Sequence, residues 1–184
     1  MKKIIIGIVV VIVLLIGSLF GSYNGLVASN ENVTGKWSQV ENQLQRRTDL
    51  ISNLVNTVKG YASHETAVFK NVSDARAKLA GATTVADKAA ANGELNGALS
   101  RLLAISENYP DLKANQNFAQ LQDELAGTEN RLAVARKDYN DAAQVFNTKI
   151  KSFPTVIYAG MFGFSAKDYF KADEGAKAVP KVTF

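Results

Sequence analysis

Residues 37–61 read WSQVENQLQRRTDLISNLVNTVKGY, a stretch in which apolar side chains return every three or four residues while an arginine pair interrupts them. The same spacing continues in both directions, from Val33 to Leu79. Alternating steps of three and four residues are typical of a long helix that packs along one seam. The spacing predicts a single helix over residues 30–79, which would be about 75 Å long.

A second stripe with this spacing runs from Phe118 to Lys149, and within it only Thr128 and the terminal Lys149 are polar. It predicts a helix over residues 115–150 that lies antiparallel to much of the first one. Two complementary seams bury each other. They therefore predict an all-α fold in which an elongated antiparallel helical bundle occupies residues 23–164.

A shorter helix is predicted between the two seams. Alanine- and leucine-rich residues follow the break at Gly81-Ala82-Thr83-Thr84. Proline disfavours the helical conformation in the residue before it, so Pro110 predicts the end of this helix. The predicted middle helix covers residues 86–107.

The N-terminus is uncharged over a long run. Residues 1–3 carry Lys2 and Lys3, and no further charge follows until Glu31. This pattern predicts a transmembrane helix over residues 4–22, with the N-terminus in the cytoplasm and the body outside. The side chains expected to anchor it are Ile4, Ile8, Val11, Leu14, Leu15 and Phe20. A signal peptide cleaved after about Ser29, which would leave a secreted soluble helical protein, is the alternative.

Gly17 and Gly21 form a GxxxG pair within the predicted span. Such a pair allows two membrane helices to approach closely, so it predicts helix–helix association. Glycine is also common in membrane helices that do not associate through it, and that interpretation stays open.

The segment after residue 152 differs in kind from the stripes. Phe153-Pro154 ends the last long helix, and residues 155–164, TVIYAGMFGF, carry six large apolar side chains. They predict a short helix over residues 154–162 that covers the end of the bundle. A surface patch that binds a partner is the alternative. Residues 165–184 are predicted to form an extended tail.

Arg47 is a charged residue on the first apolar stripe. It needs a counter-charge, and the second stripe offers Glu124 and Glu129 close to its polar position. We therefore predict that Arg47 meets one of these carboxylates and that the pair fixes the register of the two helices. In the alternative, Arg47 extends its charged end to solvent at the edge of the seam. A third interpretation has Arg46 and Arg47 bind acidic lipid or phosphate.

Composition excludes several classes of site. The chain has no cysteine and one histidine, His64, which rules out thiolate metal sites, catalytic thiols and two-histidine zinc sites. No cofactor or metal is predicted. Lys2 and Lys3 account for two charges of the net +4, and the small remainder gives no reason to expect nucleic-acid binding.

The combination of motifs resembles the LemA family of bacterial membrane proteins over nearly everything after Ser22. Beyond residues 37–61, the resemblance includes Glu107-Asn108-Tyr109-Pro110-Asp111, Gly127-Thr128-Glu129-Asn130-Arg131 and Phe162-Gly163-Phe164. The residues of this signature are Trp37, Arg46, Arg47, Asp49, Asn53, Lys59, Gly60, Tyr61, His64, Glu65, Glu129, Asn130 and Arg131. Ser52 stands where the family commonly has proline, and its presence favours a continuous first helix. The resemblance implies an anchored antiparallel bundle and no established catalytic residues.

These patterns predict a non-enzymatic scaffold or interaction protein of the bacterial envelope. Its partners would be membrane lipid, through residues 4–22, and either a second copy of the chain or another envelope protein. The alternative from another class is a lipid- or peptidoglycan-related enzyme that uses His64 and the Arg46-Arg47 pair.

Overall fold

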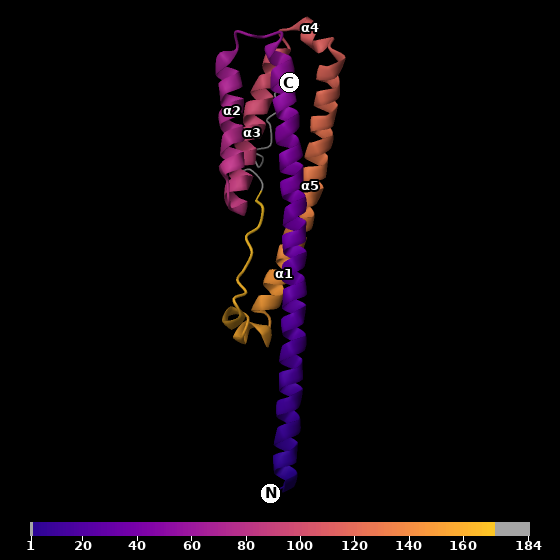
Figure 1. The fold of residues 1–184 in the computed structure, drawn as a ribbon, viewed down its shortest axis with the longest axis vertical. Coiled ribbons are helices and arrows are strands. Elements are labelled where there is room, and N and C mark those ends of the chain that lie inside the picture. The colour runs from indigo at the N-terminus through magenta and orange to yellow at the C-terminus, as the bar shows by residue number, and fades with distance from the viewer. Residues whose placement is uncertain (1, 172–184) are drawn as a thin grey trace, which may run out of the picture.

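A long helix organises the molecule. The computed structural model describes residues 2–171, apart from the side chains of residues 11, 12, 15, 16, 18 and 19. Helix α1 (Lys2–Lys59) runs the length of the molecule, and its first third projects beyond everything else (Figure 1). Its 58 residues span about 87 Å. The prediction of an all-α fold is confirmed.

The remaining elements pack along the last two thirds of α1. In chain order they are α2 (Thr66–Gly81), α3 (Val85–Ser106), the short α4 (Pro110–Lys113), α5 (Gln116–Lys151) and the 3₁₀ turns η1 (Thr155–Ile157) and η2 (Gly160–Phe162). Helix α5 packs against α1, and α2 packs against α3. The chain runs up α1, down α2, up α3 and down α5 (Figure 1).

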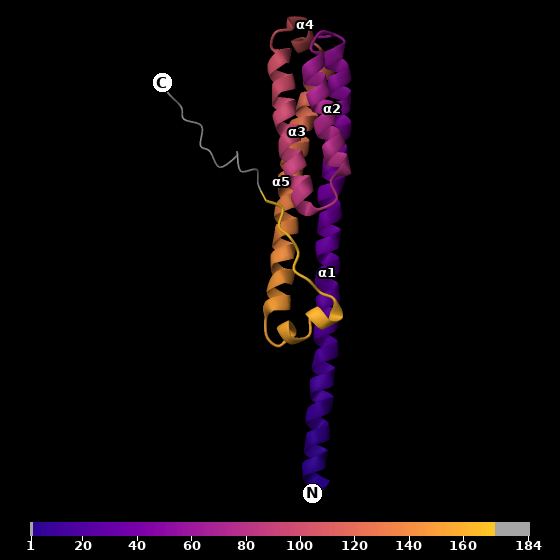
Figure 2. The same cartoon turned by 90° about the vertical axis from the view of Figure 1, so that its left-hand side faces the viewer.

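The bundle has two tiers. In the tier that ends at the α1–α2 turn, α1, α2, α3 and α5 lie side by side, whereas in the other tier α1 and α5 continue without α2 and α3 (Figure 2). Residues 164–171 run back along this two-helix tier from the η turns toward the α2–α3 pair. The extended C-terminal segment thus lies along α1 and α5 in the tier that α2 and α3 do not reach.

The core follows the two predicted stripes. From α1 it contains Val33, Val40, Leu44, Ile51, Leu54 and Val58, and from α5 it contains Phe118, Leu125, Leu132, Tyr139, Ala142, Phe146 and Ile150. Successive residues of this set are three, four or seven positions apart on each helix, so one face of α1 and one face of α5 are buried together.

The predicted helix over residues 30–79 is interrupted. Helix α1 ends at Lys59 and α2 begins at Thr66, so the chain reverses within residues 60–65. Gly60 is the least favourable residue for a helix in this region, because it has no side chain to restrict the unfolded chain. The stripe continues across the turn because α1 and α2 both bury their apolar faces in the same bundle.

A smaller expectation also differs from the structure, because residues 154–162 form two 3₁₀ turns instead of one short helix. The middle helix, α3, ends at Ser106, before Pro110. Pro110 then begins a further short helix, α4, and lies in its first turn. Proline suits this position, because its fixed φ is helical and no hydrogen bond needs its missing N–H.

The predicted transmembrane helix over residues 4–22 is not supported by the structure. These residues lie in α1, which continues into polar sequence as one helix up to Lys59. Counting only the residues that the structure describes fully, which leaves out residues 11, 12, 15, 16, 18 and 19 of this segment, no helix is long and apolar enough to cross a bilayer.

Replacing Asn115 by alanine is expected to destabilise the fold by about 1–2 kcal/mol. Its side chain caps α5 by accepting a hydrogen bond from the Phe118 N–H at 3.1 Å, and it donates another to Tyr61 Oη at 2.9 Å. Chemical denaturation measures the change. Tyr61→Phe removes only the second bond, so a loss as large as that of Asn115→Ala would show that the cap contributes nothing.

Candidate functional site

The residues considered for acid/base chemistry lie far apart. His64 is exposed in the turn after α1, whereas Arg47 lies twelve residues before the end of that helix. Twelve residues separate two positions by about 18 Å along a helix. Glu65, beside His64, accepts a hydrogen bond from Tyr109 Oη at 3.4 Å. The geometry gives no support to an active site built from His64 and the Arg46-Arg47 pair.

The structure brings Arg47 against Glu129. Arg47 is 5% exposed on the α1 seam, and its Nη1 donates a hydrogen bond to Glu129 Oε2 of α5. The other oxygen of Glu129 lies 3.6 Å from Nη1 of Arg136. Arg46 lies 3.8 Å from Glu124, but both of these side chains are more than half exposed. Two guanidinium groups therefore share one carboxylate at the seam.

The two arginines that share this carboxylate are partly removed from water, so they depend on it for a counter-charge. Loss of hydration, together with repulsion from Arg136, lowers the pKa of Arg47 to about 10. Loss of hydration also lowers the pKa of Arg136. Nε of both arginines and Nη2 of Arg136 are buried without a hydrogen-bond acceptor among the described residues. Both arginines remain charged at neutral pH and depend on Glu129, whose role in fixing the register stays a prediction.

An apolar loop, residues 153–162, lies beside the point where α1 leaves the bundle. Its Tyr158 is buried, and its Phe162 packs edge-on against Tyr23 of α1 with ring centroids 5.1 Å apart. Its exposed large side chains are Phe153, Val156, Ile157, Met161 and Phe162, of which Met161 is 84% exposed. This loop both covers the bundle end and presents an apolar surface.

The first third of α1 continues this apolar surface. Four of the predicted anchor side chains, Ile4, Ile8, Leu14 and Phe20, are exposed. The side chains of residues 11 and 15 lie outside the described set. Apart from the neighbouring residues and the nearby backbone of α1 itself, no described atom lies within 4 Å of where a Cβ atom would stand at Gly17 or Gly21. Association of a second helix at these glycines stays a prediction.

Residues 164–171, here called the strap, are held by two asparagines of α5. Asn147 accepts a hydrogen bond from the Lys167 N–H at 2.7 Å and donates one to the Lys167 carbonyl at 2.8 Å. Asn140 pairs with Phe170 in the same way, at 2.8 and 2.9 Å. Each amide side chain thus binds both backbone groups of one strap residue.

Two phenylalanines anchor the ends of the strap. The Phe164 ring lies 6.1 Å from that of Phe146 in α5. Phe170 is 6% exposed, its ring lies 6.4 Å from that of Trp37 in α1, and the Arg136 guanidinium stands 4.8 Å above it. Apolar and cation–π contacts of this kind bury Phe170 between α1 and α5 and partly bury Phe164.

A third side chain of α5 fixes the middle of the strap. Tyr139 Oη donates to the Asp168 carbonyl at 2.7 Å. Burial, with a smaller contribution from the Asp168 charge, raises the pKa of Tyr139. The phenol therefore stays protonated, as donation to a carbonyl requires.

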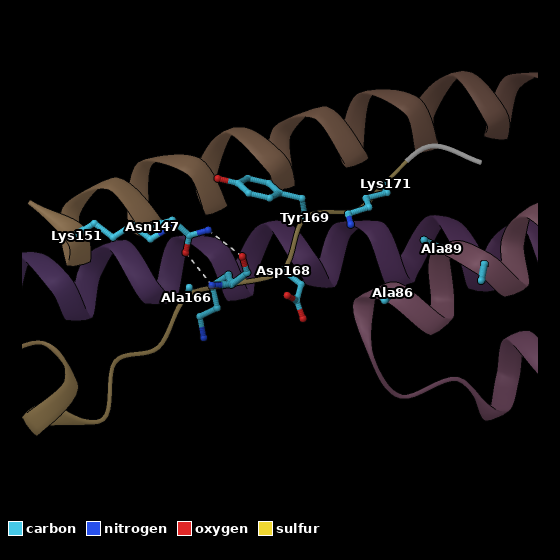
Figure 3. A pocket seen from close by; sticks show the side chains of 10 residues that line it. Ala86, Ala89, Asn147, Lys151, Ala166, Asp168, Tyr169 and Lys171 are labelled. Carbon is cyan, nitrogen blue, oxygen red and sulfur yellow. Dashed lines mark hydrogen bonds between the residues drawn. The ribbon is translucent and has the colours of Figure 1, made fainter. Parts of the chain in front are cut away.

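A pocket of about 680 Å³ lies where the strap meets the first turns of α3. Figure 3 shows Asn147 joined to the strap by its two hydrogen bonds beside this pocket. The pocket is lined on the α3 side by the small side chains of Ala86, Ala89 and Ala90. It is also bordered by Lys151, Lys167 and Lys171. Over residues 2–171, no group of three or more His, Cys, Asp or Glu side chains is placed to hold a metal ion.

Several signature residues join the ends of helices. Tyr61 accepts the hydrogen bond from Asn115, and Lys59 places its amine 5.4 Å from the centre of the Phe69 ring. Gly60 lies in the same turn. These residues fasten the α1–α2 turn to the first turns of α2 and α5, which is a structural role.

The other signature residues lie along the long helices. Trp37 packs on Tyr139, with ring centroids 5.0 Å apart, and Asp49 accepts a hydrogen bond from Gln45. Asn53, Asn130 and Arg131 are exposed. The structure does not gather this second group into one site.

Sequence reasoning did not identify the two asparagines. It predicts an extended tail over residues 165–184 but does not predict which helices this tail contacts. Residues 172–184 lie outside the described chain. The available signal is the position of the amides. Asn140 follows Tyr139 and Asn147 follows Phe146, so two amides seven residues apart each lie one position beyond the seam.

The chain matches known sequences over most of its length. A model described as the LemA family matches residues 36–184. Magnetosome protein MamQ of Magnetospirillum gryphiswaldense is 30% identical over 186 residues, which cover 86% of this chain and 68% of that protein. Magnetosome protein MamQ 1 of Paramagnetospirillum magneticum is 29% identical, with 94% and 72% covered. Protein LemA of Metamycoplasma hominis is 25% identical, with 84% and 71% covered.

Proposed function

Because the chain belongs to the LemA family, we propose that it is a non-enzymatic, membrane-anchored scaffold of the bacterial envelope that acts by self-association or by docking partners. The observation that carries this proposal is the first third of α1, which projects from the bundle with its described apolar side chains exposed. The relatives' names, MamQ and LemA, state no reaction.

The length and sequence of the projecting segment support a membrane anchor. Residues 4–22 carry no charge, and as a helix they extend over about 29 Å, close to the thickness of a bilayer's hydrocarbon core. Lys2 and Lys3 precede them, and the first basic residue after them is Lys36. By the positive-inside rule, the N-terminus lies in the cytoplasm and the bundle outside.

The apolar loop supports the same placement. The contact between Phe162 and Tyr23 sets the loop three residues along α1 from the exposed Phe20. The loop therefore lies level with the end of the apolar projection. Large apolar side chains at that level enter the boundary between lipid headgroups and acyl chains. There they avoid the free-energy cost of exposing apolar surface to water.

Charges on the projecting part of α1 test the anchor in the full-length chain. Ile8→Asp with Leu14→Asp is expected to lower the equilibrium constant for retention in membranes by roughly four orders of magnitude, so that a carbonate wash releases the chain. Each acidic residue near a bilayer centre costs about 3 kcal/mol.

Val134→Asp with Val145→Asp is the matched control. Both valines are exposed on α5, away from the projection, so the same added charge is expected to leave the membrane fraction unchanged. Equal retention of the two double variants would overturn the proposed anchor.

Chemical crosslinking followed by mass spectrometry tests the scaffold role. The full-length protein extracted in mild detergent is expected to give crosslinks to a second copy or to an envelope protein. A protein that stays strictly monomeric and captures no partner would contradict this role while leaving the anchor intact.

A further inference from the structure

We infer that the end of the bundle beside the projecting part of α1 docks on the bilayer as a second contact, and that this docking surface prefers anionic lipid. It combines the apolar loop, residues 153–162, with three lysines, Lys149, Lys151 and Lys167. The inference rests on the proposed function, because it places residues 4–22 in the same bilayer. It adds a preference for lipid charge, which the uncharged residues 4–22 do not supply.

The packing of α5 on α1 gives the level of Lys151. Trp37 and Tyr139 stack with ring centroids 5.0 Å apart, so these two residues stand level on the antiparallel helices. Lys151 lies twelve residues further along α5, and Gly25 lies twelve residues back along α1. Lys151 therefore stands level with Gly25, about 4.5 Å beyond residue 22, where the proposed span ends.

A hollow between the two helices gives the same register for Lys149. It is lined by Gly25 and Leu26 of α1 and by Lys149 and Ser152 of α5. Lys149 comes two residues before Lys151, so it stands about 3 Å farther from the span and points to the opposite side of α5. The end of α5 thus carries positive charge on both sides.

The strap brings Lys167 to the same end of the bundle. Its backbone is bound by Asn147, which lies one helical turn before Lys151 beside the same pocket (Figure 3). The Lys167 amine stands 5.6 Å from the ring centre of Phe146. One turn places Lys167 about 10 Å beyond the end of the span. All three lysines therefore lie within roughly one Debye length, about 10 Å at moderate salt, of the proposed membrane boundary.

These three lysines are not neutralised by the bundle. In the described part of the chain, no carboxylate oxygen lies within 4.0 Å of the amine of Lys149, Lys151 or Lys167. Asp168 follows Lys167 on the strap, which runs away from the span. Glu31 of α1 stands about 13.5 Å beyond the end of the span. The charge nearest the proposed boundary is therefore positive.

The apolar loop completes the docking surface. It begins two residues after Lys151, and its Phe153 and Met161 are 81% and 84% exposed. Apolar side chains that enter the acyl boundary, with lysines beside them at the level of the headgroups, are typical of surfaces that bind anionic bilayers. The bilayer that holds residues 4–22 reaches this level, so it is the partner that the surface meets.

Helix capping is the competing explanation for two of the lysines. Lys149 and Lys151 lie in the last turn of α5, where positive charge favours the helix dipole. Lys167 lies on the strap, outside any helix, so this explanation does not cover it. Lys167 therefore separates lipid binding from helix capping.

Lipid retention by the full-length protein tests the charged part of the surface. The protein is placed in nanodiscs of equal parts phosphatidylcholine and phosphatidylglycerol, and native mass spectrometry identifies the lipids that stay bound. Lys149→Gln with Lys151→Gln and Lys167→Gln is expected to lower the preference for phosphatidylglycerol roughly 100-fold, because each lysine near a membrane surface contributes about fivefold.

The matched control removes the same charge elsewhere. Lys70→Gln with Lys113→Gln and Lys137→Gln changes exposed lysines of the rest of the bundle and is expected to leave the preference unchanged. Circular dichroism checks that each variant is helical. If the first triple variant does not fold, Lys167→Gln alone carries the test, with an expected loss of about fivefold.

A fluorescent label tests the apolar part of the surface. The chain has no cysteine, so Met161→Cys accepts an environment-sensitive dye at one position. In nanodiscs, this dye is expected to emit at a shorter wavelength than the same dye at Val134→Cys. Val134 is 62% exposed on α5, far from the apolar loop, and provides the water-exposed reference.

Two results would overturn the docking surface. The first is an equal preference for phosphatidylglycerol in the two triple variants, and the second is equal emission at positions 161 and 134. Either result in a chain that resists a carbonate wash would leave the anchor of residues 4–22 intact. A chain that the wash releases, but that still prefers phosphatidylglycerol through the three lysines, would contradict the anchor and keep the docking surface.

Discussion

Replacing Glu129 by alanine is expected to lower the free energy of unfolding by about 3 kcal/mol. The variant leaves Arg47 and Arg136 at the seam without the carboxylate that they share, and Arg47 is almost fully buried. The expected loss lies at the low end for a broken buried pair, because Glu129 itself is 39% exposed and solvent screens part of the interaction. Equilibrium denaturation in detergent measures the change.

Two companion variants separate this effect from a general loss of charge. Glu124→Ala breaks only an exposed contact and is expected to cost about 0–1 kcal/mol. Arg47→Met leaves Glu129 paired with Arg136 and removes a buried charge, so stability is expected to change by about 1 kcal/mol or less. A loss from Arg47→Met as large as that from Glu129→Ala would contradict the shared-carboxylate description.

Phe146→Ala is expected to cost about 3–5 kcal/mol, the usual range for a phenylalanine removed from a packed core. Phe146 is fully buried on α5, it packs against Phe164, and the Lys167 amine stands 5.6 Å from its ring centre. The variant therefore loses core packing and one anchor of the strap. Denaturation measures the first effect, and faster tryptic cleavage after Lys167 measures the second.

Val145→Ala provides the control on the neighbouring position. Val145 is more than half exposed, and its loss is expected to change stability by about 0.5 kcal/mol or less, with the strap still protected from trypsin. Equal losses of stability from Phe146→Ala and Val145→Ala would mean that the face of α5 that carries Phe146 is not the buried face.

The long seams could be predicted because burial imposes a spacing. A helix that buries one face must return an apolar residue every three or four positions, and Leu44, Ile51 and Leu125 follow that rule and are buried. The same reasoning located Arg47 as a charge in need of a partner. The LemA resemblance, confirmed by the family match, came from residues along these helices.

The break after Lys59 could not be read from the same pattern. Apolar spacing reports which residues are buried but not whether the chain reverses between them, and Val58 and Val72 are buried in different helices. The stripe was therefore continuous although the helix was not. Gly60 was the single local sign of the turn.

The strap was missed for a different physical reason. Its backbone is held by side chains of α5, and the rings that pack into the bundle are the partly buried Phe164 and the buried Phe170, six positions apart. That spacing belongs to neither a helix nor a strand. The partners Asn140 and Asn147 lie next to seam residues, where polar side chains are ordinarily solvated.

Because α1 is uninterrupted, it fixes the distance between the apolar projection and the α1–α2 turn. Between residue 22 and Lys59 the helix has no break, so its rise fixes the α1–α2 turn about 56 Å from the end of the apolar projection. Where residues 4–22 lie in a bilayer, the turn that carries Tyr61 and His64 stands at that distance from it. In the proposed anchored state, this unbroken helix holds the α1–α2 turn at one distance from the membrane, and a partner that binds the turn must reach that distance.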